Sequence, residues 1–131
     1  MAEHQNVERA RKGYEAFKTG DLDTMKELFS DDIVWHVGGN NSLTGDYKGQ
    51  EDVFNLFGRI MQETDSTLNN EVHDILGNDE HVIALVHVTA KRGSKTLDTN
   101  SVQVFHVNSN GNVTESWTFV EEADTWNDFW S

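Results

Sequence analysis

Two histidines and a glutamine are the residues of this chain whose types could do acid/base chemistry on a small molecule. His36 lies within the apolar segment 33–37, and His87 and Gln103 lie within two later segments rich in Val, Thr and aromatic residues. An imidazole titrates near neutral pH and can carry a proton to or from carbon or oxygen. We therefore take His36, aided by His87 and Gln103, as the candidate catalytic group.

Each of these residues also has a structural alternative. His36 could be a core histidine that donates to a backbone carbonyl, and His87 could serve only to orient His36 or to bridge to Gln103. A buried amide such as Gln103 must be hydrogen-bonded, but its partner could be protein as well as ligand. The sequence leaves these alternatives open.

The composition argues against metals, cofactors and several classes of partner. The chain has no cysteine, and no helical His-x-x-x-His or Glu-x-x-His spacing supports a metal site built on the histidines. Its 10 Lys+Arg against 23 Asp+Glu give a net charge of -13, which repels nucleic acid and anionic membranes. With no basic-then-apolar leader and no apolar run of about 20 residues, a cytoplasmic protein is expected.

Three helices are expected in the first half of the chain. Val7, Ala10, Tyr14 and Phe17 recur at helical spacing, which predicts a helix over about 4–18 that ends at Gly20. Asp21 can cap a second, shorter helix that stops before residue 30. A broad apolar stripe containing Val53, Phe57 and their neighbours predicts a third helix over about 50–63.

The second half of the chain predicts an antiparallel meander. Runs over about 81–91, 96–107 and 113–121 are separated by short turn signals around Gly93 and Gly111, and a weaker run over 68–76 precedes them. Residues 33–37 form an earlier strand, and 124–131 a last turn packed on the body. Helices followed by strands indicate an α+β fold, and 131 residues suit one domain, 1–131.

The chain resembles the SnoaL-like branch of the NTF2-like superfamily, which includes ketosteroid isomerases, polyketide cyclases and limonene epoxide hydrolases. The resemblance covers nearly the whole chain and is carried by the segments Gly-Asp-Leu-Asp at 20–23, Trp-His-Val-Gly-Gly at 35–39 and Gly-Asp-Tyr-Lys-Gly at 45–49, with Gly111 and Trp117. It implies a cone: three N-terminal helices packed on a strongly curved antiparallel or mixed sheet around an apolar cavity, often in a homodimer.

The same resemblance implies site residues. His36 falls where ketosteroid isomerases carry a general-base aspartate, and Gln103 falls where they carry a protonated aspartate that donates to the oxyanion. The helix tyrosine of that family falls on Gly13, next to Tyr14. The positions correspond, but the carboxylates are replaced. The Tyr-x-Asn strand of limonene epoxide hydrolases is absent.

Strand alternation predicts which side chains face the cavity. Pockets are mostly apolar with a few placed polar groups, so the mixed face of 82–90, with Leu85, His87 and Thr89, is assigned inward. The remaining predicted pocket residues come from the helices and the other strands: Tyr14, Val34, Tyr47, Val53, Phe57, Ser101, Phe105, Ser116 and Thr118. The opposite face should form a homodimer interface, made of Val86, Val88, Val102, Val104, Trp117 and Phe119.

Three functions follow from this arrangement. The first is a cofactor-independent isomerase, aldol-type cyclase or hydrolase in which His36 transfers a proton within a small, largely apolar substrate. The second is a non-catalytic module that binds or senses such a molecule, favoured by the lack of a carboxylate in the predicted pocket. The third is a dimeric scaffold whose cone is filled by side chains.

Overall fold

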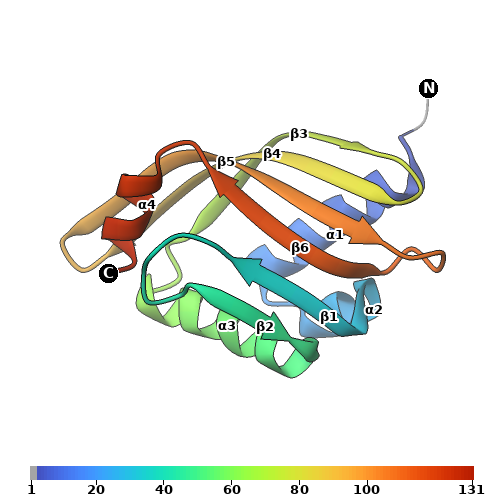
Figure 1. The fold of residues 1–131 in the computed structure, drawn as a ribbon, viewed down its shortest axis with the longest axis horizontal. Coiled ribbons are helices and arrows are strands. Elements are labelled where there is room, and N and C mark those ends of the chain that lie inside the picture. Colours follow the sequence, from blue (N-terminus) through green and yellow to red (C-terminus); the bar gives the residue numbers. More distant parts are fainter. Residues whose placement is uncertain (1–2) are drawn as a thin grey trace.

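Four helices and six strands make up residues 3–131, the part of the chain that the computed structural model describes (Figure 1). In chain order they are α1 (Gln5–Thr19), α2 (Leu22–Leu28), β1 (Phe29–Val37), β2 (Gly45–Lys48), α3 (Gly49–Glu63), β3 (Asn69–Gly77), β4 (His81–Arg92), β5 (Lys95–Val107), β6 (Val113–Val120) and α4 (Ala123–Phe129).

The first two helices begin and end where their capping residues dictate. Gly20 adopts a left-handed conformation with φ of 73°, and its N–H donates to the carbonyls of Ala16 and Phe17. Such a C-cap favours glycine because a side chain there would be strained. The carboxylate of Asp21 then accepts from the backbone N–H of Thr24 and starts α2. The helices expected over 4–18 and after Asp21 are confirmed.

Two short elements differ from the expectation. The segment Gly45–Lys48 is a strand that pairs with β1, for example Tyr47 opposite Trp35, although its flanking glycines suggest only a turn. The tail contains the helix α4, which at seven residues is too short to show a periodic pattern. β1 begins at Phe29, directly after α2, with no loop between the two elements.

The six strands form one mixed sheet in the order β2-β1-β6-β5-β4-β3. Antiparallel hairpins join β3 to β4, β4 to β5 and β5 to β6, whereas β1 lies parallel to β6. Helices α1 and α3 lie behind the sheet in Figure 1, with α2 beside the start of β1. This arrangement confirms the α+β fold with helices packed on a mixed sheet.

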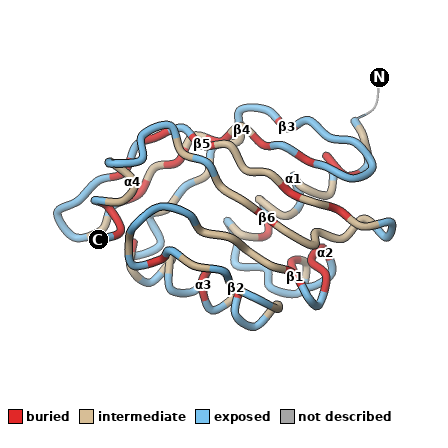
Figure 2. The backbone as a smooth tube through the Cα atoms, in the orientation of Figure 1, coloured by how far each residue is buried: buried red, intermediate tan, exposed pale blue. Residues whose placement is uncertain are grey.

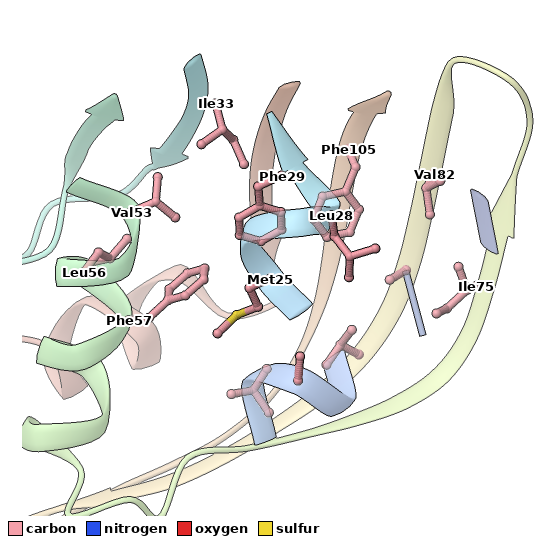
Figure 3. Close-up of a cluster of buried hydrophobic side chains, with 14 of the residues drawn as sticks. Met25, Leu28, Phe29, Ile33, Val53, Leu56, Phe57, Ile75, Val82 and Phe105 are labelled. Carbon is pink, nitrogen blue, oxygen red and sulfur yellow. The ribbon is translucent and has the colours of Figure 1, made fainter. Parts of the chain in front are cut away.

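The core lies between the helices and one face of the sheet. Figure 3 shows Met25 and Leu28 of α2, Phe57 of α3, and Phe29 and Phe105 of the sheet converging there. From His81 to Lys91 of β4, buried residues alternate with residues that are half-buried or exposed, which Figure 2 draws in red, tan and pale blue. One face of β4 is therefore turned into the core along its whole length.

The C-terminal segment closes one end of the molecule. Phe129 and Trp130 are almost fully buried, and Arg92 Nη1 donates to the Phe129 carbonyl at 3.1 Å. Lys95 Nζ donates to the Asp128 carbonyl at 2.9 Å, so the hairpin between β4 and β5 holds α4 in place. Within residues 3–131, no helix is both long and apolar enough to cross a membrane.

Candidate functional site

A cavity of about 140 Å³ lies between the helices and the sheet. We call the sheet face that lines it the inner face, and the opposite face the outer face. Aromatic and branched aliphatic side chains from α1, α2, α3 and four strands make up most of its wall, among them Phe17, Leu28, Phe29, Trp35, Phe57, Val86, Val88 and Phe105. The rings of Phe29, Trp35, Phe57 and Phe105 contact one another edge to face or tilted. The wall is therefore mainly apolar.

The inner face of β4 is the fully apolar one. Val82, Val86 and Val88 line the cavity, and Ala84 and Ala90 are buried beside them. The expectation that Leu85, His87 and Thr89 face the cavity, with Val86 and Val88 outside, is therefore wrong. The inner face of β4 packs beneath α1 and must be apolar, while the polar groups of the cavity come from α1, β3, β5 and β6.

The inner faces of β5 and β6 match the expected alternation. Ser101, Gln103 and Phe105 line the cavity, as does Thr118 of β6. Ser116 is fully buried behind them, and its Oγ lies 3.4 Å from Gln103 Nε2. Whether these side chains contact a ligand stays a prediction.

The central polar feature of the cavity is a pair formed by Tyr14 and Gln103. The Tyr14 hydroxyl donates to Gln103 Oε1, which joins α1 to β5 across the cavity. Gln103 Nε2 has only two long contacts, each of 3.4 Å, to Ser116 Oγ and Thr118 Oγ1. Burial raises the pKa of Tyr14, so its hydroxyl stays protonated. The pair thus offers a ligand an N–H donor and the lone pairs of a phenol oxygen.

His36 does not lie in the cavity. It is on the outer face of β1, where its ring stacks on Trp117 with centroids 4.9 Å apart. Nδ1 lies 2.7 Å from Asp46 and Nε2 lies 2.9 Å from Glu115. These two carboxylates, Glu115 foremost, raise the pKa of His36. The predicted placement of His36 is wrong, and that of Val34 with it, because Ile33, Trp35 and Val37 are the inward residues of β1.

His87 occupies a separate place on the outer face. Its Nδ1 lies 2.7 Å from Asn100 Oδ1 and its Nε2 lies 2.8 Å from Asp98. Hydrogen bonding with Asn100, together with nearby carboxylates, raises the pKa of His87. Strands β5 and β6 separate it from His36. The structure therefore does not bring His36, His87 and Gln103 together.

The lining residues limit the chemistry that the cavity can perform. Among residues 3–131, its lining includes no histidine, aspartate, glutamate or lysine, and its titratable groups are Tyr14 and Arg9. Over the same range, no cluster of three or more His, Asp or Glu side chains is placed to hold a metal ion. The cavity can hold an apolar molecule and hydrogen-bond an oxygen, but it offers no side chain that would be a base near pH 7.

Comparison with known proteins identifies the family. The sequence profile described as the SnoaL-like domain matches residues 10–116. The chain belongs to the SnoaL-like domain family.

Relatives of this SnoaL-like domain include proteins of known structure. Bal32a, from a soil-derived mobile gene cassette, is 38% identical, with a TM-score of 0.93 over 97% of each chain. Uncharacterized protein Rv0034 of Mycobacterium tuberculosis is 27% identical over the full length of both chains. A Jannaschia sp. CCS1 protein, provisionally assigned as a SnoaL-like polyketide cyclase, is 16% identical, with a TM-score of 0.79 over 98% of this chain and 94% of its own. The last likeness shows the fold alone.

Three further predicted pocket residues of this SnoaL-like domain lie in different places. Phe57 of α3 lines the cavity. Val53 is fully buried in the core behind it, and the Tyr47 hydroxyl donates to the Leu43 carbonyl at 2.7 Å, so neither lines the cavity. Both expectations are corrected: α3 presents only part of its apolar stripe to the cavity, and Tyr47 lies on β2 with its hydroxyl bonded to the backbone.

The sequence interpretation missed several lining residues. Trp35 carries a period-two signal with Ile33 and Val37 that would have placed it inward. Asn6 and Arg9 lie near the start of α1 and also line the cavity. Asn6 stands four residues before Ala10, on the same helical face, which is the one signal that could have found it.

Proposed function

We propose that the cavity binds a small, largely apolar molecule reversibly and holds one of its oxygen atoms against Tyr14 and Gln103. The observation that carries this proposal is the partly buried Tyr14–Gln103 pair in the wall of a mainly apolar cavity. Gln103 Nε2 is poorly satisfied by its two contacts of 3.4 Å, so a ligand carbonyl would give it a better acceptor.

The size of the cavity supports a ligand of about one aromatic ring with a short chain. Engineered apolar cavities of about 150 Å³ bind benzene, and this one measures about 140 Å³. The aromatic wall would contact such a ring edge to face, while Tyr14 and Gln103 set the orientation of its polar end.

Benzylacetone is a suitable probe because it joins a phenyl ring to a methyl ketone through two carbons. In isopentylbenzene, its matched analogue, a methyl group replaces the ketone oxygen. We expect the protein to bind benzylacetone about fivefold more tightly, the gain from one neutral hydrogen bond, with both dissociation constants measured by NMR titration. Gln103→Leu should abolish this preference. Asn100→Leu, on the outer face of the same strand, should retain it.

Two results would reject the proposal. One is that neither probe binds, which would remove the cavity as a ligand site. The other is a ketone preference that survives Gln103→Leu combined with Tyr14→Phe, since the oxygen would then be recognised elsewhere.

A cyclase-type enzyme is the second candidate, in which the Tyr14 hydroxyl would turn from Gln103 Oε1 to a substrate carbonyl and polarise it. Binding is the better-supported function because no lining residue among 3–131 would accept a proton from carbon near pH 7. The two functions differ in deuterium exchange at the carbons next to the ketone of benzylacetone. Binding alone predicts the same exchange rate with and without protein. An acceleration of tenfold or more that Tyr14→Phe removes would favour the enzyme.

We also propose that two copies of the chain form a homodimer through the outer face. Two apolar rows cross β4, β5 and β6: Ile83, Val104 and Trp117, then Leu85, Val102 and Phe119. We call these six residues the outer patch. Phe119 is 58% exposed and Ile83 39%. A second copy of the chain would cover such a patch, so the interface uses Ile83 and Leu85 in place of the inward Val86 and Val88.

A further inference from the structure

The buried amide of Asn6 has one oxygen without a hydrogen-bond partner. Asn6 is 5% exposed and lines the cavity. Within residues 3–131, the buried side-chain atoms that lack a partner are Asn6 Oδ1, Ser30 Oγ and Trp130 Nε1, and of these three residues Asn6 alone lines the cavity. A buried polar group without a partner costs stability, so an unpaired acceptor in a cavity wall needs an explanation.

The orientation of this amide is fixed by its nitrogen. Asn6 Nδ2 donates to the carbonyl of Asn78 at 3.1 Å and to that of Asp79 at 3.3 Å. Turning the amide over would set its oxygen against two carbonyl oxygens, which repel it. Oδ1 is therefore held as the free acceptor.

Neighbouring residues make this end of the cavity suitable for a hydroxyl group. Arg9 Nε donates to the Gly111 carbonyl at 2.7 Å and Nη2 donates to Asn112 Oδ1 at 2.9 Å, which leaves further guanidinium N–H donors. A Cβ on Gly111 would lie 3.1 Å from Arg9 Nε and 3.5 Å from Asn6 Oδ1, so the glycine keeps this space open. A hydroxyl can donate to Asn6 and accept from Arg9 at once.

We propose that Asn6 Oδ1 forms a second polar subsite of the cavity, which accepts a hydrogen bond from a ligand hydroxyl. The inference rests on the proposed binding function and narrows its ligand class. Asn6 and Tyr14 are eight residues apart on α1, about 12 Å along the helix axis. The ligand is therefore an elongated apolar molecule with a carbonyl at one end and a hydroxyl at the other.

The test compares benzylacetone with its para-phenol, 4-hydroxybenzylacetone. The hydroxyl should strengthen binding to the unaltered protein about fivefold. Asn6→Ala should remove this gain, so that the two probes bind about equally. Asn6→Asp loses the same two amide donations but keeps an oxygen acceptor, so it should preserve the gain. Both variants lose the contacts to Asn78 and Asp79, so a purely structural effect would weaken both probes alike in both variants.

The same subsite can be tested on the unaltered protein alone. The carboxamide carbon resonance of Asn6 should shift with 4-hydroxybenzylacetone and not with benzylacetone. If benzylacetone binds but the hydroxyl adds nothing, or if Asn6→Ala keeps the gain, the subsite is rejected and the proposed function stands. If neither probe binds, both the subsite and the proposed binding function are rejected.

Discussion

The hydroxyl of Tyr14 on α1 donates to Oε1 of Gln103 on β5, directly across the cavity. This bond joins a helix to the middle of the sheet and fixes the orientation of the Gln103 amide. It also keeps Gln103 Nε2 turned toward Ser116 and Thr118. This polar pair in the wall is therefore in place before any ligand arrives.

Tyr14→Phe should destabilise the protein by about 1–2 kcal/mol, because it leaves Gln103 Oε1 buried without its donor. It should also weaken benzylacetone binding about fivefold. Urea unfolding and NMR titration would measure the two effects. The matched control is Tyr47→Phe, which removes a hydroxyl that donates to the Leu43 carbonyl; Tyr47 does not line the cavity, so binding should be unchanged. Equal binding losses in both variants would contradict the role of the pair.

Neighbouring substitutions on β4 test which face is turned inward. Val86→Asp places an unpaired carboxylate in the core and should cost several kcal/mol or prevent folding. Leu85→Asp lies on the outer face and should cost less than about 1 kcal/mol of monomer stability. Thermal unfolding at low protein concentration would measure both. The reverse order of stabilities would show that the strand is turned the other way.

The predicted and observed elements show which features of this fold the sequence predicts and which it does not. The apolar stripes of α1 and α3, the Gly20 cap and the hairpin turns all carry local signals, so these elements are predictable. Both faces of β4 carry apolar residues, however, and a one-residue error exchanges them. Which face of β4 is turned inward is decided by α1, which covers one of them. This is a contact between residues far apart in the sequence, so no local pattern predicts it.

The candidate site was predictable only in part for the same reason. Gln103 and Tyr14 lie on strongly patterned elements, and both line the cavity as expected. The imidazole of His36 makes it a candidate base. However, Ile33, Trp35 and Val37 alternate along β1 as its inward residues, so His36 lies on the outer face. No sequence signal tells that Asn6 is buried with a free oxygen, since this depends on the hairpin at Asn78 and Asp79.

His36 should make stability depend on pH. Because Glu115 and Asp46 raise its folded-state pKa, the protonated imidazole stabilises the fold. This contribution is complete below the unfolded value of about 6.5 and is lost as pH rises through the folded-state pKa. At this partly exposed position it should not exceed about 1 kcal/mol. The stability difference between the unaltered protein and His36→Asn should shrink as pH rises above about 6.5. A difference that grows with pH would contradict the assignment.

The outer patch should hold two copies of the chain together. Phe119→Asp places a charge on the β6 side of the outer patch, at a side chain that is 58% exposed, and should weaken the dimer by tenfold or more, as measured by sedimentation equilibrium. Leu22→Asp is the control, since Leu22 is 46% exposed on α2 and lies outside the patch. The dimer proposal fails if the unaltered protein is monomeric at all concentrations, or if the control dissociates equally.

The cavity is proposed to hold an apolar molecule by one oxygen. The most direct measurement is a crystal structure of the protein with benzylacetone. The phenyl ring should lie among the aromatic side chains of the inner face, and the ketone oxygen should lie within about 2.7–3.2 Å of Gln103 Nε2. Benzylacetone bound only on the outer face, or in the cavity with its oxygen away from Gln103 Nε2, would contradict the proposal.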